Sequence, residues 1–152
     1  GFPPCTPEAC LEVLDYYNID LAGKRVVVIG RSLVVGKPVA MMLLKRNATV
    51  TICHTKTQNM PALCREADIL IVAAGRAGII GRDYLAPSQV VIDVGINVND
   101  QGKLCGDVNF DEAQGLVGAL TPVPGGVGAI TTSVLVGHVL QAARRERGTP
   151  RG

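Results

Sequence analysis

Short runs of aliphatic and β-branched residues alternate along the chain with segments whose apolar positions recur every three or four residues. The continuous apolar runs predict strands buried on both faces, and the periodic segments predict amphipathic helices. We expect strands at residues 25–29, 49–53, 69–73 and 90–94, with a brief fifth at 118–121. We expect helices at residues 7–17, 36–46 and 60–67, a short one capped by Asn109, and a long closing helix from Thr131.

The order of these elements indicates the fold class. Buried strands that alternate with helices are typical of an α/β protein with a doubly wound, mainly parallel sheet and right-handed crossovers. One segment departs from this alternation, because Asp100-Gln101-Gly102 indicates a turn between two extended arms. The sequence therefore predicts an α/β domain that carries one antiparallel excursion.

Composition narrows the class of protein. The chain has 152 residues, of which 47% are hydrophobic and 18% charged. That length suits one domain with its own core, and the composition argues against disorder. We expect no membrane partner, since no apolar run reaches the roughly 18 residues of a spanning helix and the start lacks the pattern of a signal peptide. The start on a Pro-rich stretch without Met suggests a piece of a longer protein.

The cysteine pattern points to free thiols. Five cysteines, at positions 5, 10, 53, 64 and 105, form no CxxC pair and have no zinc-ligand spacing. We expect reduced, structural thiols in a reducing compartment, and therefore a cytoplasmic protein, or a mitochondrial one in a eukaryote.

The net charge of +2 conceals an asymmetry. Residues 21–65 hold eight Lys and Arg and no Asp or Glu, a charge of +8, whereas the remaining seven basic and 13 acidic residues give −6. Such a segment attracts a polyanion, either a nucleic acid or a phosphorylated small molecule, although most of these cations are expected on solvated faces. With only five aromatic residues the chain lacks a base-stacking platform, so we expect no nucleic-acid partner.

The first predicted strand ends in a glycine turn. Gly30-Arg31-Ser32 follows the strand directly, and Gly36 opens the next helix. Strand, glycine turn and helix form the context in which a helix N-terminus receives phosphate. The string matches neither GxGxxG nor a P-loop, so an ordinary strand-to-helix turn is the alternative reading.

The end of the second predicted strand bears on the choice of dinucleotide. A fold that prefers NAD places an acid there for the ribose 2′-hydroxyl, whereas this strand ends in His54-Thr55-Lys56. A 2′-phosphate is repelled by a carboxylate and held by hydroxyls and cations. We therefore expect Arg31, Thr55 and Lys56 to converge on the adenosine end of NADP.

The third and fourth predicted strands also end in glycines. Ala74-Gly75 and Gly95-Ile96 stand at carboxyl ends where a flat ligand can approach the backbone. Asp93 is a candidate catalytic acid, but a lone aspartate at a strand end more often binds loop backbone. The sequence shows no catalytic triad and no metal cluster, so it indicates a cofactor-binding domain without its own chemistry.

At this point the chain resembles the bifunctional methylenetetrahydrofolate dehydrogenase/methenyltetrahydrofolate cyclohydrolase family. The matching strings follow the family's order across nearly the whole chain. They are residues 4–7 (PCTP), 23–38 (with GRSLVVGKP), 49–54 (TVTICH), 93–97 (DVGIN), 106–108 (GDV) and 121–128 (TPVPGGVG).

The resemblance implies a Rossmann-like NAD(P)-binding fold at residues 25–143, after an N-terminal helical segment (1–24) and before a frayed basic tail (144–152). Members oxidise 5,10-methylenetetrahydrofolate with NADP, some with NAD, and hydrolyse the methenyl product to 10-formyltetrahydrofolate. The implied cofactor contacts are Gly30, Arg31 and Ser32 for the phosphates, Thr55 for the 2′-phosphate, Ile96 for the nicotinamide ribose and Thr131 for the nicotinamide. Pro124, Gly125 and Gly126 would border the folate cleft.

The family's catalytic Lys and Tyr belong to an N-terminal domain that would precede Gly1, so we expect no catalytic residue in this chain. Three departures from the family pattern are Thr55 for Ser, Arg76-Ala77 for Lys/Arg-Pro, and Ala129-Ile130 for Pro-Met. The last leaves open an alternative, a catalytically inactive cofactor-binding or assembly module of the same fold. The resemblance also implies a homodimer, to which the Val98 and Leu104 arms would contribute an antiparallel edge.

Overall fold

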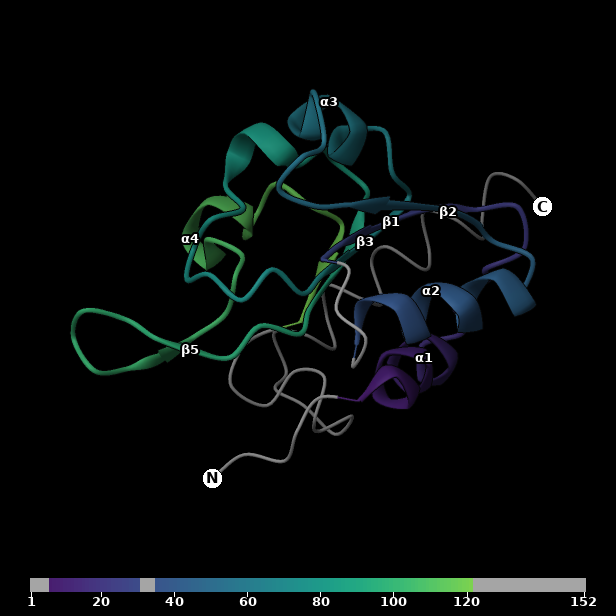
Figure 1. Ribbon diagram of the computed structural model, residues 1–152, viewed down its shortest axis with the longest axis horizontal. Helices are drawn as coiled ribbons and strands as arrows, with labels where there is room; N and C mark the ends of the chain where they lie inside the picture. The colour runs from purple at the N-terminus through teal and green to yellow at the C-terminus, as the bar shows by residue number, and fades with distance from the viewer. Residues whose placement is uncertain (1–5, 31–34, 122–152) are drawn as a thin grey trace.

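In a computed structural model, the structure of the chain is described for residues 6–30 and 35–121. The predicted helix from Thr131 and the tail 144–152 lie outside the described residues. Within them, five strands form one sheet in the order β2-β1-β3-β4-β7, and every neighbouring pair is parallel. The α/β fold with a mainly parallel sheet is thereby confirmed (Figure 1).

The strands lie where the apolar runs predicted them. β1 (Arg25–Ile29) and β2 (Thr49–Cys53) have the expected bounds, while β3 (Ile69–Val72) and β4 (Val90–Asp93) each end one residue early. β7 is Ala119–Leu120. The register pairs Ile29 with Cys53 and with Val72, and Val72 in turn with Asp93. The carboxyl ends of four strands are therefore level and form one edge of the sheet.

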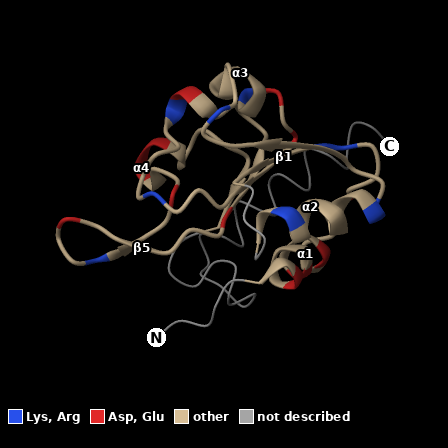
Figure 2. Ribbon diagram, viewed as in Figure 1, with Lys and Arg blue, Asp and Glu red and all other residues tan. Residues whose placement is uncertain are grey.

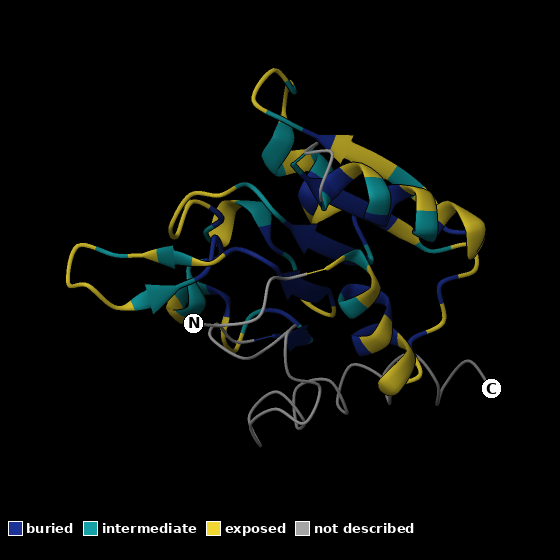
Figure 3. Ribbon diagram, turned by 60° about the horizontal axis from the view of Figure 1, so that its bottom comes forward, coloured by how far each residue is buried: buried dark blue, intermediate teal, exposed yellow. Residues whose placement is uncertain are grey.

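Each face of the sheet packs on its own hydrophobic core. Val26 and Val28 point into a cluster with α1 (Pro7–Tyr16) and α2 (Gly36–Lys45), whereas Val27 and Ile29 point into a second cluster. The second cluster includes residues of α3 (Met60–Arg65) and α4 (Phe110–Ala113), and the segment around the 3₁₀-helix η1 (Arg82–Tyr84). The central strands are buried on both sides, while β2 exposes much of its length as an edge strand (Figure 3).

Two helix starts are built as the sequence predicted. The Thr6 hydroxyl accepts a hydrogen bond from the N–H of Ala9 at 3.2 Å, and the Asn109 side chain accepts one from the N–H of Glu112 at 3.2 Å. These caps satisfy N–H groups that a helix start leaves without intrahelical partners. The helices α1, α2 and α3 end one or two residues before their predicted ends.

The antiparallel excursion is a small hairpin of β5 (Asn97–Val98) and β6 (Leu104–Cys105), which extends away from the sheet (Figure 1). The predicted turn is confirmed, with Asn99 accepting bonds on its side chain from the N–H groups of Gln101 and Lys103. No helix among residues 6–30 and 35–121 is long and apolar enough to cross a membrane.

Candidate functional site

Gly30 lies where three strand ends meet. Its N–H donates to the carbonyl of Cys53 at the end of β2, over 2.8 Å. Its φ is +114°, and a Cβ atom at this position would overlap the carbonyl group of Ala73, directly after β3. Both the backbone conformation and the close approach require glycine. Gly30, the first residue of the expected glycine turn, therefore stands at the centre of the carboxyl edge.

The turn after β2 is held by its own bonds. The His54 N–H donates to the Thr57 hydroxyl at 2.8 Å, the Thr57 N–H to the His54 carbonyl at 2.9 Å, and the Lys56 N–H to the His54 ring at 3.1 Å. This turn exposes Thr55 and Lys56 to solvent at the carboxyl edge. A hydroxyl and an ammonium group are thus available to an anion beside the end of β2.

Cys53 and Cys64 form a buried thiol pair beneath this turn. The hydrogen bond from Cys64, with a further one from Thr57, lowers the pKa of Cys53 to about 7. The same pairing and burial raise the pKa of Cys64. The four described cysteines form no disulfide with one another, and Cys5 lies outside the described residues.

Helix α2 begins at Gly36, at the same edge as Gly30. Val35 at the position before it has no side-chain acceptor, and the first turn carries Lys37 and no acid. Such a helix start is compatible with an anion, because the helix dipole is positive there. Arg31 and Ser32 lie outside the described residues.

The basic residues of segment 21–65 are not gathered at this edge (Figure 2). Arg25 begins β1 and Lys45 ends α2, and both therefore lie at the opposite edge of the sheet, because a crossover helix runs antiparallel to its strands. The guanidinium of Arg46 binds both carboxylate oxygens of Asp15 at 2.8 Å. Among the described residues, only Lys37 and Lys56 of this set lie at the carboxyl edge. The charge of +8 for the whole segment is therefore larger than the positive charge that an anion bound at this edge would meet.

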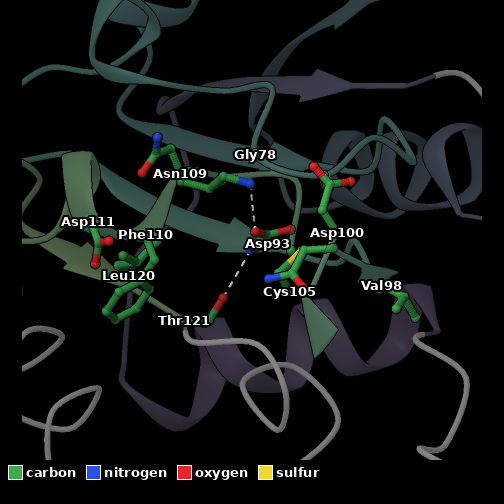
Figure 4. Close-up of a pocket in the computed structure, with 14 residues that line it drawn as sticks. Gly78, Asp93, Val98, Asp100, Cys105, Asn109, Phe110, Asp111, Leu120 and Thr121 are labelled. Atoms are coloured by element: carbon green, nitrogen blue, oxygen red, sulfur yellow. Dashed lines mark hydrogen bonds between the residues drawn. The ribbon is translucent and has the colours of Figure 1, made fainter. Parts of the chain in front are cut away.

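Asp93, the last residue of β4, binds loop backbone as expected. Its carboxylate accepts hydrogen bonds from the N–H groups of Gly95 at 2.9 Å, Asp107 at 3.1 Å and Val108 at 2.9 Å. Burial raises its pKa to about 6, against the lowering effect of these donors, and the nearby Asp107 charge adds to the rise. Its own N–H donates to the Thr121 hydroxyl at 2.9 Å (Figure 4).

Asp107 has an extensive set of bonds that the sequence analysis missed. This fully buried carboxylate accepts bonds from the N–H groups of Ala74, Gly75 and Arg76, at 2.7, 3.0 and 2.9 Å. The Asn97 amide donates to it at 2.8 Å. The only signal in the sequence was the string Gly106-Asp107-Val108, to which no role was given. Asp107 thus ties the loop after β3 to the loop after β4.

Some backbone groups of the predicted cofactor-binding residues after β3 and β4 are therefore already used in hydrogen bonds within the protein. The N–H groups of Ala74 and Gly75 already donate to Asp107, so a ligand would meet other atoms of these residues. Gly95 is buried against the same carboxylate, while Ile96 is 48% exposed beside it. Thr131, Pro124, Gly125 and Gly126 lie outside the described residues.

A pocket of about 510 Å³ lies beside this edge, between the hairpin, α4 and the ends of β4 and β7 (Figure 4). Asp93, Asp100 and Asp111 line it, and these carboxylates are unfavourable for the phosphates of a dinucleotide. None of the predicted cofactor residues lines it. The described residues also hold no group of three metal-binding side chains.

Comparison with known proteins gives the family of this fold. The model of the tetrahydrofolate dehydrogenase/cyclohydrolase NAD(P)-binding domain matches residues 4–147. The bifunctional protein FolD of Carboxydothermus hydrogenoformans is 61% identical over 144 residues, which cover 93% of this chain and 50% of that protein. The chain therefore spans about half the length of the curated relatives that it matches.

Solved structures agree with the fold. Bifunctional FolD from Campylobacter jejuni superposes with a TM-score of 0.80 at 44% identity, over 96% of this chain and 52% of that one. The FolD enzyme of Trypanosoma brucei, solved with NADP and an inhibitor, gives 0.75 at 38% identity, over 95% of this chain and 52% of that one.

Proposed function

Because the chain belongs to the tetrahydrofolate dehydrogenase/cyclohydrolase family, we propose that it is the NADP-binding domain of a bifunctional enzyme of folate one-carbon metabolism. The whole enzyme oxidises 5,10-methylenetetrahydrofolate to the methenyl form and hydrolyses that product to 10-formyltetrahydrofolate. The solved Campylobacter jejuni relative is named as a methylenetetrahydrofolate dehydrogenase/cyclohydrolase, and the family model describes the NAD(P)-binding domain of such enzymes.

The observation that carries the proposal of NADP is the end of β2. Exposed Thr55 and Lys56 stand there, in a segment without any acid from residue 21 to residue 65. A hydroxyl and an ammonium group suit a ribose 2′-phosphate, whereas the carboxylate that an NAD-binding fold uses is missing. The solved Trypanosoma brucei relative with bound NADP supports the same cofactor.

The rest of the carboxyl edge fits a dinucleotide. Gly30 lets the backbone approach a pyrophosphate, and the start of α2 supports negative charge. Gly75, Gly95 and Ile96 would face the nicotinamide half, with Arg31, Ser32 and Thr131 as further cofactor contacts. A nicotinamide cofactor supplies the hydride acceptor for the oxidation. The protein residues proposed here bind and orient it, and none is proposed as catalytic.

The folate substrate and the catalytic groups belong to the enzyme as a whole. Because the chain spans about half of its relatives, we propose that an N-terminal catalytic domain completes the active site. Pro124, Gly125 and Gly126 would border the folate from this chain. Assay of the intact protein for both reactions tests this proposal. Turnover supports the enzyme, and the absence of both activities in a folded, NADP-binding protein supports the inactive module.

A charge-reversal pair tests the cofactor proposal. Lys56→Glu is expected to weaken NADP binding by about tenfold to a hundredfold, since it replaces a charge-assisted contact with repulsion. Lys45→Glu makes the same charge change at the opposite edge of the sheet and is expected to leave affinity within about twofold. Equal effects of the two variants would contradict a 2′-phosphate site at Lys56.

We propose a homodimer that uses the β5–β6 hairpin. Val98 on β5 is 66% exposed, and the hairpin extends away from the sheet (Figure 1). Sedimentation of the chain and of Val98→Asp tests this, with loss of the dimer expected in the variant. A monomer in both contradicts it.

The free thiols support a reducing compartment, and hence we propose a cytoplasmic location.

A further inference from the structure

Two buried aspartates, Asp93 at the end of β4 and Asp107 shortly after β6, each lie against a glycine that neighbours the other aspartate. Asp93 contacts Gly106, the residue before Asp107, and Asp107 contacts Gly95, two residues after Asp93. A Cβ atom on either glycine would overlap the facing carboxylate. The two aspartates thus require the two glycines. Together the four residues hold the segment before the hairpin (93–95) against the segment after it (106–107).

The bonds of Asp107 reach only one part of the carboxyl edge. Three consecutive N–H groups at residues 74–76 converge on its carboxylate, the arrangement of a backbone anion site that is filled by a side chain. The Asn97 amide brings the loop after β4 to the same carboxylate. By contrast, the turn at residues 54–57 after β2 is held by bonds among its own residues.

The loops that Asp107 binds and the turn after β2 lie where the two different halves of a dinucleotide would bind. With the adenosine end at β2, the strand order β2-β1-β3-β4 carries a bound dinucleotide across the edge toward β4. The loops that Asp107 fixes are therefore those beside the nicotinamide half. Resting on the proposed function, we propose that Asp107 is a positioning residue that holds the loops after β3 and β4 in place for the nicotinamide half of NADP.

Removing the charge of Asp107 tests this selectively. In Asp107→Asn the amide presents N–H groups toward backbone donors, so several of the four bonds are lost and the two loops separate. Binding of NADP is expected to weaken by about tenfold or more, because loops that must be ordered on binding oppose it. Binding of adenosine 2′,5′-bisphosphate, which lacks the nicotinamide half, is expected to change by less than about twofold.

The experiment is calorimetric titration of the chain and its variants with both ligands. Asp111→Asn, an exposed acid on α4, makes the same charge change and is expected to alter neither affinity. Asn97→Ala removes one bond to Asp107 and leaves its three backbone bonds. It provides a milder variant if Asp107→Asn does not fold, with an expected loss of a few-fold for NADP alone.

The outcomes separate the two proposals. Selective loss of NADP affinity in Asp107→Asn, or in Asn97→Ala if only that variant folds, supports the positioning role. If the wild-type chain binds both ligands and the folded variant binds NADP equally well, or loses both ligands equally, the positioning role is wrong while the proposed function stands. If the wild-type chain binds neither ligand, the proposed function fails and the positioning role fails with it.

Discussion

The carboxylate of Asp107 lies directly against the backbone of Gly95, with no room for a side chain between them. Asp107 is fully buried and accepts four hydrogen bonds, so it has little freedom to retreat. The glycine in the segment Asp93-Val94-Gly95 is therefore explained by a neighbouring side chain, and not by a positive φ angle.

Gly95→Ala is expected to destabilise the fold and weaken NADP binding. The added methyl group overlaps the Asp107 carboxylate and displaces it from its donors, at a cost of about 1–3 kcal/mol. Chemical denaturation measures the free energy of unfolding. Gly81→Ala is the matched control, because its Cβ would meet the end of the Glu112 side chain, which can rotate away at the cost of one exposed hydrogen bond from the Arg82 N–H. A similar cost for both variants would contradict the special rigidity of Asp107.

Gly30→Ala is expected to be more harmful than Gly23→Ala. Both glycines have positive φ, +114° and +75°, so both substitutions strain the backbone. Only at Gly30 does the new Cβ also overlap backbone, the carbonyl group of Ala73. We expect a cost of about 1 kcal/mol at Gly23 and at least about 2 kcal/mol more at Gly30.

Thermal or denaturant unfolding gives both values for the glycine pair, and NADP titration gives a second comparison. Gly30→Ala is expected to lose measurable NADP binding, whereas Gly23→Ala, at the other end of β1, keeps it. Equal stabilities of the two variants would contradict the cost assigned to the overlap with the carbonyl group of Ala73.

Asp93 is expected to make stability depend on pH. Its pKa in the fold is about 6, above the ordinary value of 3.8, chiefly because of burial. The folded state therefore holds this proton more tightly than the unfolded state does. The group's contribution is fully present below about pH 4 and is lost as pH rises through 6, by about 3 kcal/mol at most.

The test is the free energy of unfolding between pH 4 and pH 7 in the wild type and in Asp93→Asn. The variant has no group to titrate at this position, so the decline assigned to Asp93 should disappear from its curve. Asp107 faces Asp93 directly, and Asp100 and Asp111 line the adjoining pocket; the variant leaves all three carboxyl groups in place. Parallel curves would rule out a raised pKa at Asp93.

Much of the fold follows from local sequence patterns. The bounds of β1 were predicted correctly because a strand buried along nearly all of its length leaves an uninterrupted apolar signal. Those of β2 were predicted correctly because Thr, Val and Ile favour a strand even at the edge of the sheet, where most of these side chains are exposed. Thr6 and Asn109 were recognisable as caps because a cap is read from the few residues beside it. The 3₁₀-helix η1 was not predicted, since three residues give no periodic signal.

The residues of the candidate site could be predicted only where a side chain of suitable chemistry directly follows a predicted strand. The exposed Thr55 and Lys56 follow a strand directly, so the sequence placed them at the carboxyl edge. The role of Asp107 depends on contacts with residues 74–76, more than 30 residues earlier, and only the folded chain brings them together. The spread of the basic residues over both edges depends on which end of its strand or helix each one occupies, and the net charge of a segment does not contain that information.

The most direct test of the central claim is calorimetric titration of the wild-type chain with NADP and, separately, with NAD. A domain that recognises the 2′-phosphate through the acid-free end of β2 should bind NADP at least about tenfold more tightly. Equal affinities, tighter binding of NAD, or no binding of either would contradict it.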